Sequence, residues 1–240
     1  MLIKNNLKIQ EVAIAISAKN LNPTILNPDF LKYTGIIPTD WELARQPVYT
    51  NQAVQLVFQS GVSIVAQPNR ITFMEAIASK SFDELQLAEI ACNYVDKLSQ
   101  VEYIAVGINP VGYVGFNSDA ESYQYLSQTL LSPGSWQSFG EAPMKAGVEL
   151  SYTLHRSKLN LKINQAVLKF PDKSVSAVLF SGNFNYQVVG DNSAEKKKDL
   201  QKLVTNWQAN LQTYQQLIED NFLSATNENM NMLPLIPQAS

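Results

Sequence analysis

The feature that most constrains this fold is an internal repeat in the sequence. Three pairs of segments match in the same order along the chain: 14–23 with 104–110, 30–41 with 125–136, and 53–58 with 147–152. In the middle pair, FLKYTGIIPTDW aligns without a gap on YLSQTLLSPGSW, which places Trp41 over Trp136. Matches that keep their order predict one supersecondary unit used twice.

Hydrophobic periodicity predicts the same element order in both halves. Alternation with a period of two predicts strands at 7–18, 53–58, 62–66, 71–77, 103–108, 148–155, 159–168 and 175–185. Capping residues and apolar stripes predict helices at 28–33, 81–98, 118–132 and 193–222. The glycines of GINPVGYVG (107–115) predict a turn-rich segment after the strand at 103–108. Each half therefore reads strand, helix, three-strand meander, helix.

This order predicts an α+β fold. We expect tandem units at 1–99 and 100–224 that share one antiparallel sheet, with helices on one face and a pseudo-two-fold relation. The two units should form one compact domain, and 225–240 should be a flexible tail. The order resembles the duplicated sheet-and-helix unit of the TATA-binding protein and of helix-grip folds. That resemblance implies a fold only, because fold does not imply function.

Composition restricts the class of partner. Only 16 % of residues are charged and the net charge is −3, so nucleic acid is an unfavourable partner. Cys92 is the single cysteine, and its apolar surroundings predict a small buried hydrophobe rather than a disulfide or a metal ligand. The apolar runs are too short for a secretory signal or a membrane helix. The sequence thus favours a soluble, cytoplasmic protein without a membrane partner.

No residue pattern predicts catalysis. His155 is the only histidine, and no carboxylate or nucleophile accompanies it in sequence. The glycines of 107–115 lack the spacing of a phosphate-binding loop. Glu75 and Glu149 are isolated and meet only if the fold brings them together. We therefore expect no catalytic residue, cofactor or metal, and the sequence favours a protein that is not an enzyme.

Two sets of residues are candidates for binding. Trp41 and Trp136 either anchor their repeats on the sheet or form a pair of interface contacts. Within the tail, an apolar run is suited to docking as an extended peptide on a groove or sheet edge. Its candidate residues are Met232, Leu233, Leu235 and Ile236.

The leading hypothesis is a non-catalytic binding or assembly protein that contacts another protein or a second copy of itself. The alternative is a small-molecule binder or enzyme with a cavity between sheet and helices, lined by Tyr, Asn and Gln. SGNFNY (181–186) can present two amides to a ligand. A pocket that collects Glu75 and Glu149 would favour the alternative, and a fully packed sheet–helix layer would reject it.

Overall fold

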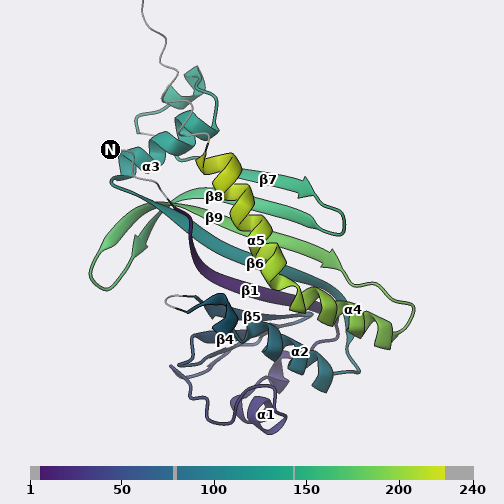
Figure 1. The fold of residues 1–240 in the computed structure, drawn as a ribbon. Coiled ribbons are helices and arrows are strands. Elements are labelled where there is room, and N and C mark those ends of the chain that lie inside the picture. The colour runs from purple at the N-terminus through teal and green to yellow at the C-terminus, as the bar shows by residue number, and fades with distance from the viewer. Residues whose placement is uncertain (1–5, 78–79, 143, 225–240) are drawn as a thin grey trace, which may run out of the picture.

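The computed structural model describes residues 6–77, 80–142 and 144–224 of the chain. Its centre is one nine-stranded antiparallel sheet, accompanied by helices α1 to α5 (Figure 1). The strand order is β2-β3-β4-β5-β1-β6-β9-β8-β7. This arrangement confirms the predicted α+β class and the antiparallel sheet.

The predicted strands are present, and apart from one their ends differ from prediction by one or two residues. They are β1 (Lys8–Lys19), β3 (Val54–Val57), β4 (Val62–Gln67), β5 (Arg70–Ala76), β6 (Glu102–Phe116), β7 (Gly147–Thr153), β8 (Lys158–Lys169) and β9 (Ser174–Gln187). A short strand that was not predicted, β2 (Val48–Tyr49), pairs with β3. The helices are α1 (Pro28–Tyr33), α2 (Leu87–Lys97), α3 (Asp119–Gln124), α4 (Ser193–Thr205) and α5 (Trp207–Ile218). Shorter helical turns are η1 (Pro23–Ile25), η2 (Phe82–Glu84), η3 (Tyr125–Leu130), η4 (Ser135–Ser138) and η5 (Glu219–Leu223).

The middle of the sheet joins the two halves of the chain. Strands β1 and β6 pair antiparallel, with Ile14 opposite Ile108. The other neighbour of β1 is β5, and the other neighbour of β6 is β9. Strands from the first half therefore lie on one side of the β1–β6 pair and strands from the second half on the other, as the colours in Figure 1 show.

The predicted turn-rich segment after 108 is wrong. Residues 109–115 continue β6, which pairs with β1 on one side and β9 on the other. The pairing with β9 is interrupted only at Asn109 and Pro110, because proline lacks the N–H that a ladder needs. Pairing with β1 as far as Tyr113, and with β9 on either side of the interruption, satisfies the backbone of this segment and outweighs the low strand propensity of glycine.

Two predicted long helices are each divided. The segment from Ser81 opens with η2 and becomes α2 only at Leu87, where the buried Glu75 carboxylate accepts hydrogen bonds from the helix N-terminus. The C-terminal segment is α4 and α5 with a break at Asn206, followed by η5. The Asn206 carbonyl accepts a bond from the Asn210 side chain at 3.2 Å, which stabilises the break.

One face of the sheet carries helices and the other is open. Helix α2 packs on β1 and β5, α4 and α5 pack on β6, and α2 also contacts α4 (Figure 1). Val12, Ile14 and Ile16, which point to this face, are fully buried. Leu, Ile, Val and Phe side chains fill most of the layer between sheet and helices.

Tyr214 of α5 packs against the sheet at two glycines, Gly112 and Gly182. A Cβ atom at Gly182 would lie 3.0 Å from Tyr214 Cδ2, and one at Gly112 would lie 3.1 Å from the Tyr214 hydroxyl. The hydroxyl donates to the Phe180 carbonyl at 2.8 Å, and the Tyr214 side chain is fully buried. Gly112 of β6 and Gly182 of β9 therefore provide space for an aromatic ring.

Candidate functional site

The two candidate tryptophans lie in different surroundings. Trp41 is half-buried, and its ring centroid lies 5.3 Å from that of Phe58. Trp136 lies in η4 and is 49 % exposed. Both occupy the connection between the first helix of a unit and its meander. The difference in burial counts against a shared structural role, and a binding role for either residue stays a prediction.

The other candidate contacts lie outside the described residues. Met232, Leu233, Leu235 and Ile236 belong to the 225–240 segment. Their docking as an extended peptide therefore stays a prediction.

The carboxylates that a catalytic alternative requires are not brought together. Glu75 lies on β5 and is fully buried, whereas Glu149 lies on β7 and forms an exposed ion pair with Lys162 at 3.6 Å. These strands belong to opposite sides of the sheet. Across residues 6–77, 80–142 and 144–224, no group of three His, Cys, Asp or Glu side chains is placed to hold a metal ion.

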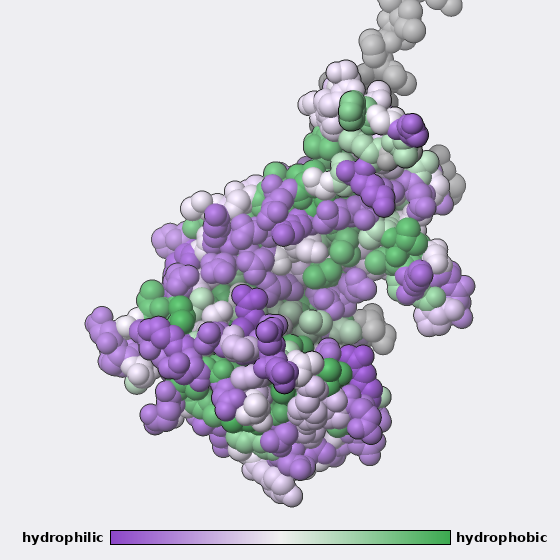
Figure 2. Space-filling view, turned by 180° about the vertical axis from the view of Figure 1, so that it is seen from behind, coloured by the Kyte–Doolittle hydropathy of each residue, from purple (hydrophilic) through white to green (hydrophobic). Residues whose placement is uncertain are grey.

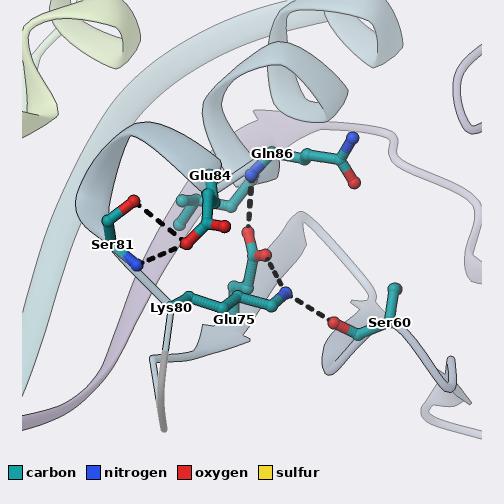
Figure 3. A network of polar contacts seen from close by, with 7 residues as sticks. Ser60, Glu75, Lys80, Ser81, Glu84 and Gln86 are labelled. Carbon is teal, nitrogen blue, oxygen red and sulfur yellow. Dashed lines mark hydrogen bonds and ion pairs between the residues drawn. The ribbon is translucent and has the colours of Figure 1, made fainter.

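Glu75 is instead a structural hub (Figure 3). Its Oε1 accepts a bond from Lys80 Nζ at 2.7 Å, and its Oε2 accepts the backbone N–H groups of Gln86 at 2.8 Å and Leu87 at 3.0 Å. Lys80 Nζ also donates to the Ser60 carbonyl at 2.6 Å. The carboxylate therefore joins the β4–β5 hairpin to the start of α2.

The predicted capping pair lies beside this hub. Both the backbone N–H and the hydroxyl of Ser81 donate to the Glu84 carboxylate, at 2.6 and 3.0 Å. These bonds hold the pKa of Glu84 below its ordinary value. Ser81 and Glu84 thus cap the start of η2, and not that of one continuous helix over 81–98.

Cys92 has the character expected of a packing residue. Its side chain is partly buried against the core. Burial, with a smaller effect of the neighbouring Asp96, raises the pKa of the Cys92 thiol to about 11. The thiol is therefore almost fully protonated at neutral pH, and a protonated thiol is a poor nucleophile.

The sheet ends differently at its two edges. One edge is β2, a strand of two residues, whereas the other is β7, a strand of seven residues. In the described part of the chain, no strand lies on the outer side of β7. An unpaired strand edge is a template for pairing with another chain, and edges are commonly shortened or covered for that reason.

The turn after β7 defines which of its backbone groups face outward. The Leu154 N–H donates to the Ser157 carbonyl at 2.8 Å, which closes the β7–β8 hairpin. Because bonding alternates along an antiparallel pair, every second residue of β7 directs its N–H and C=O away from β8. The residues with outward-facing backbone groups are Gly147, Glu149, Ser151 and Thr153.

The open face of the sheet is largely hydrophilic, with separate hydrophobic patches (Figure 2). A row of polar side chains crosses it between neighbouring strands. Asn183 Nδ2 donates to Asn109 Oδ1, and the Ser151 hydroxyl donates to Asn160 Oδ1 at 2.6 Å. Asn160 is the register partner of both Asn183 and Ser151, so the row runs from β6 to β7. Asn183, one of the two amides of 181–186, therefore binds the Asn109 amide of the neighbouring strand.

A cleft of about 550 Å³ lies at the end of the sheet–helix layer. The β7–β8 turn, β9 and the α4–α5 junction line it. The lining side chains that the structure places there are Leu154, His155, Arg156, Ser157, Phe184, Tyr186, Lys202, Leu203, Thr205, Asn206, Ala209, Asn210 and Thr213. The layer is thus packed in its interior and hollowed at one end.

Two partly buried hydrogen bonds organise the floor of this cleft. The Tyr186 hydroxyl donates to Asn210 Oδ1 at 2.5 Å, and Asn210 Nδ2 donates to the Asn206 carbonyl at 3.2 Å. Asn210 is only 5 % exposed. These two bonds fix the side-chain amide of Asn210 and the break between α4 and α5.

An ion pair fixes the rim of the cleft. The Arg156 guanidinium donates to both carboxylate oxygens of Asp199, at 3.1 and 3.2 Å, and the Val189 N–H also donates to Asp199 at 3.0 Å. Partial burial tends to raise the pKa of Asp199, but these bonds outweigh it and hold the pKa below its ordinary value. Asp199 is therefore charged at neutral pH and orients Arg156.

Sequence reasoning did not identify this cleft. The predicted strand 148–155 includes His155, whereas in the structure His155 and Arg156 lie in the β7–β8 turn. No sequence pattern connects them with Lys202, Tyr186 and Asn210. The signal available was weak, because the segments that line the cleft lie far apart in the sequence.

Comparisons with known proteins do not assign a family: no protein-family model and no curated protein matches this sequence. Among the described helices, none is both long and apolar enough to cross a bilayer.

Proposed function

We propose that this chain is a non-catalytic assembly protein that pairs with a second copy of itself, edge to edge, through β7. The observation that carries the proposal is the contrast between the two edges of the sheet. One edge ends in a strand of two residues, and the other presents seven residues with outward-facing backbone groups. β7 also contains no proline, which would weaken edge pairing.

The alternating direction of the backbone groups along β7 restricts the register in which two copies of β7 can pair. In a two-fold symmetric pair, the residues of β7 whose N–H and C=O groups point away from β8 must lie opposite one another. An axis through Leu150 satisfies this condition and pairs the whole strand from Gly147 to Thr153. In this register Leu150 faces Leu150, and Val148 faces Tyr152, all on the helix-bearing face.

Side-chain chemistry favours the same register. Val148, Leu150 and Tyr152 are half-buried and extend the hydrophobic core to the edge. Pairing would remove their remaining apolar surface from water, which stabilises association. On the open face, Glu149 of one copy faces Ser151 of the other. An axis through Glu149 would instead place the two carboxylates opposite each other, and like charges in that position are destabilising.

The chain's internal organisation supports edge pairing as a mode of assembly. We interpret the three pairs of matching segments and the shared element order as a tandem duplication about the β1–β6 pair, with a pseudo-two-fold relation. In that interpretation the nine-stranded sheet itself formed by antiparallel pairing of two edge strands, β1 and β6. Self-association through β7 repeats the same step between two chains.

The test of β7 pairing is the variant Ser151→Pro. Proline removes an N–H that faces outward, so it leaves the β7–β8 ladder intact and blocks the added strand. Sedimentation equilibrium should show a weak dimer for the natural chain, with a Kd in the range of about 1–100 µM. Ser151→Pro should raise the Kd at least about tenfold, which corresponds to about 1.4 kcal/mol.

The matched control is Ser151→Ala, which loses the hydroxyl bond to Asn160 but keeps the backbone N–H. It should dimerise like the natural chain. A natural chain that stays monomeric at the highest concentrations measured would contradict the proposal. Loss of the dimer on truncation after Thr226, with β7 unchanged, would also contradict β7–β7 pairing and would assign the edge to the C-terminal segment.

A further inference from the structure

We propose that the cleft between the β7–β8 turn and the α4–α5 junction binds a small organic anion, a carboxylate with an aromatic or aliphatic body. This inference goes beyond self-association and does not depend on it, because the outward-facing groups of β7 do not line the cleft.

The volume and position of the cleft suit a small ligand. A volume of about 550 Å³ lies within the range of about 300–1,000 Å³ that is typical of small-molecule sites. The cleft is bounded by a hairpin turn, a strand and a helix junction, so its walls come from three separate parts of the chain. Hydrogen bonds and an ion pair hold each of these walls, and the site is therefore preformed.

The floor of the cleft is suited to an apolar body. Leu154 lines the cleft and is 37 % exposed, and Tyr186 is partly exposed, so both offer apolar surface to a ligand. Phe184 and Leu203, at 1 % and 8 % exposure, are lining residues that already belong to the core. The polar groups of the floor bind one another, since the Tyr186 hydroxyl and Asn210 share a hydrogen bond. A ligand that covers this floor buries apolar surface without leaving these groups unpaired.

The rim of the cleft is suited to an anion. Arg156 and Lys202 line it together with His155, and the lining contains no Asp or Glu side chain. Within the described residues Lys202 makes no ion pair at contact distance, although its charge interacts with Asp199 at longer range. Arg156 is held by Asp199 through two of its five N–H groups, which leaves donors for a carboxylate.

The charge of the carboxylate and the size of its body can be tested separately. Phenylacetate and its neutral amide, phenylacetamide, have the same apolar body and differ in charge. Saturation-transfer NMR and calorimetry on the full chain should show binding of phenylacetate, with phenylacetamide about tenfold weaker. Lys202→Gln should weaken phenylacetate binding about three- to fivefold, the effect of losing an exposed ion pair.

Lys198→Gln is the matched control for charge, because Lys198 is an exposed lysine of the same helix that does not line the cleft. Ala209→Phe tests the cavity itself. Ala209 is exposed and lines the cleft, so a larger side chain should fill the space without disturbing the core. Thr213→Phe, at a second exposed lining position, serves the same purpose if Ala209→Phe lowers the melting temperature.

The expected result is that Lys198→Gln binds phenylacetate like the natural chain, whereas a folded variant with a filled cleft does not bind it. No saturation transfer to millimolar phenylacetate would overturn the proposal. So would equal binding of phenylacetamide, or phenylacetate binding that survives in a folded Ala209→Phe or Thr213→Phe chain. A dimer that persists in the filled-cleft variant would show that self-association through β7 is independent of anion binding in the cleft.

Discussion

At the scale of single residues, the most informative side chain is the buried carboxylate of Glu75. A buried charge is costly unless it is paired and hydrogen-bonded. Glu75 meets this condition through Lys80 and the backbone N–H groups of Gln86 and Leu87, at the start of α2 (Figure 3). Sequence alone did not distinguish Glu75 from the exposed Glu149. Both are isolated acids in strand-like segments, and only the packing of α2 onto β5 buries one of them.

This arrangement predicts the effect of Glu75→Gln. The substitution keeps the shape of the side chain but removes its charge and places an amide donor against the donors of Lys80 or α2. We expect a loss of about 2–4 kcal/mol in the free energy of unfolding, measured by urea denaturation. Glu84→Gln, at the exposed capping pair, is the control and should change stability little. Equal stability of Glu75→Gln and the natural chain would show that the hub is dispensable.

At the scale of elements, the glycines in β6 and β9 have a structural purpose that the sequence did not reveal. The sequence predicts a turn-rich segment at Gly112 and a strand at Gly182. Both lie within long strands, where the absence of a Cβ provides space for Tyr214 of α5. A similar long-range effect divides the C-terminal helix. Its apolar stripe was identified correctly, but the break at Asn206 depends on a side-chain bond from Asn210.

Docking of α5 predicts that Gly182→Ala destabilises the fold. A Cβ at this position would lie 3.0 Å from Tyr214 Cδ2 and 3.3 Å from Pro110 Cγ, so the ring must move or the strand must bend. Overpacking of this kind costs about 1–3 kcal/mol, equivalent to a fall of several degrees in melting temperature.

Gly115→Ala is the control in a neighbouring strand, because a Cβ there would approach only Val175 Cγ1. Calorimetry should therefore show a clear decrease for Gly182→Ala and little change for Gly115→Ala. Equal melting temperatures of the two variants would contradict the fit of Tyr214 at Gly182.

At the scale of the whole molecule, the two halves share their central strand pair and a helix contact. β1 and β6 are each other's neighbours along most of their length, and α2 packs against α4. Two polar contacts of Asp96 reinforce that helix contact, one with Lys197 at 2.6 Å and one with Gln201 at 3.0 Å. Either half alone would expose one side of the central pair and part of the core.

We therefore predict that neither half folds independently. Residues 1–99 and 100–240, produced separately, should lack a cooperative thermal transition, whereas the full chain should unfold in one transition. Circular dichroism melts of each half, and of the two mixed, test this prediction. A cooperative transition of 1–99 alone would show instead that each unit is a separate domain.

The sequence by itself determined where most strands and helices lie and the α+β class of this protein. Alternation in segments such as 12–18, turn residues such as Gly61 and Asn69, and caps such as Asn27 act over a few residues, and short-range patterns of this kind are visible in one dimension. Tertiary structure alone decided which isolated acid is buried, why β6 continues through its glycines, where the last helix breaks, which strand forms the long edge and where a cleft remains. Each of these depends on residues far apart in the chain whose packing and hydrogen bonds override local propensity.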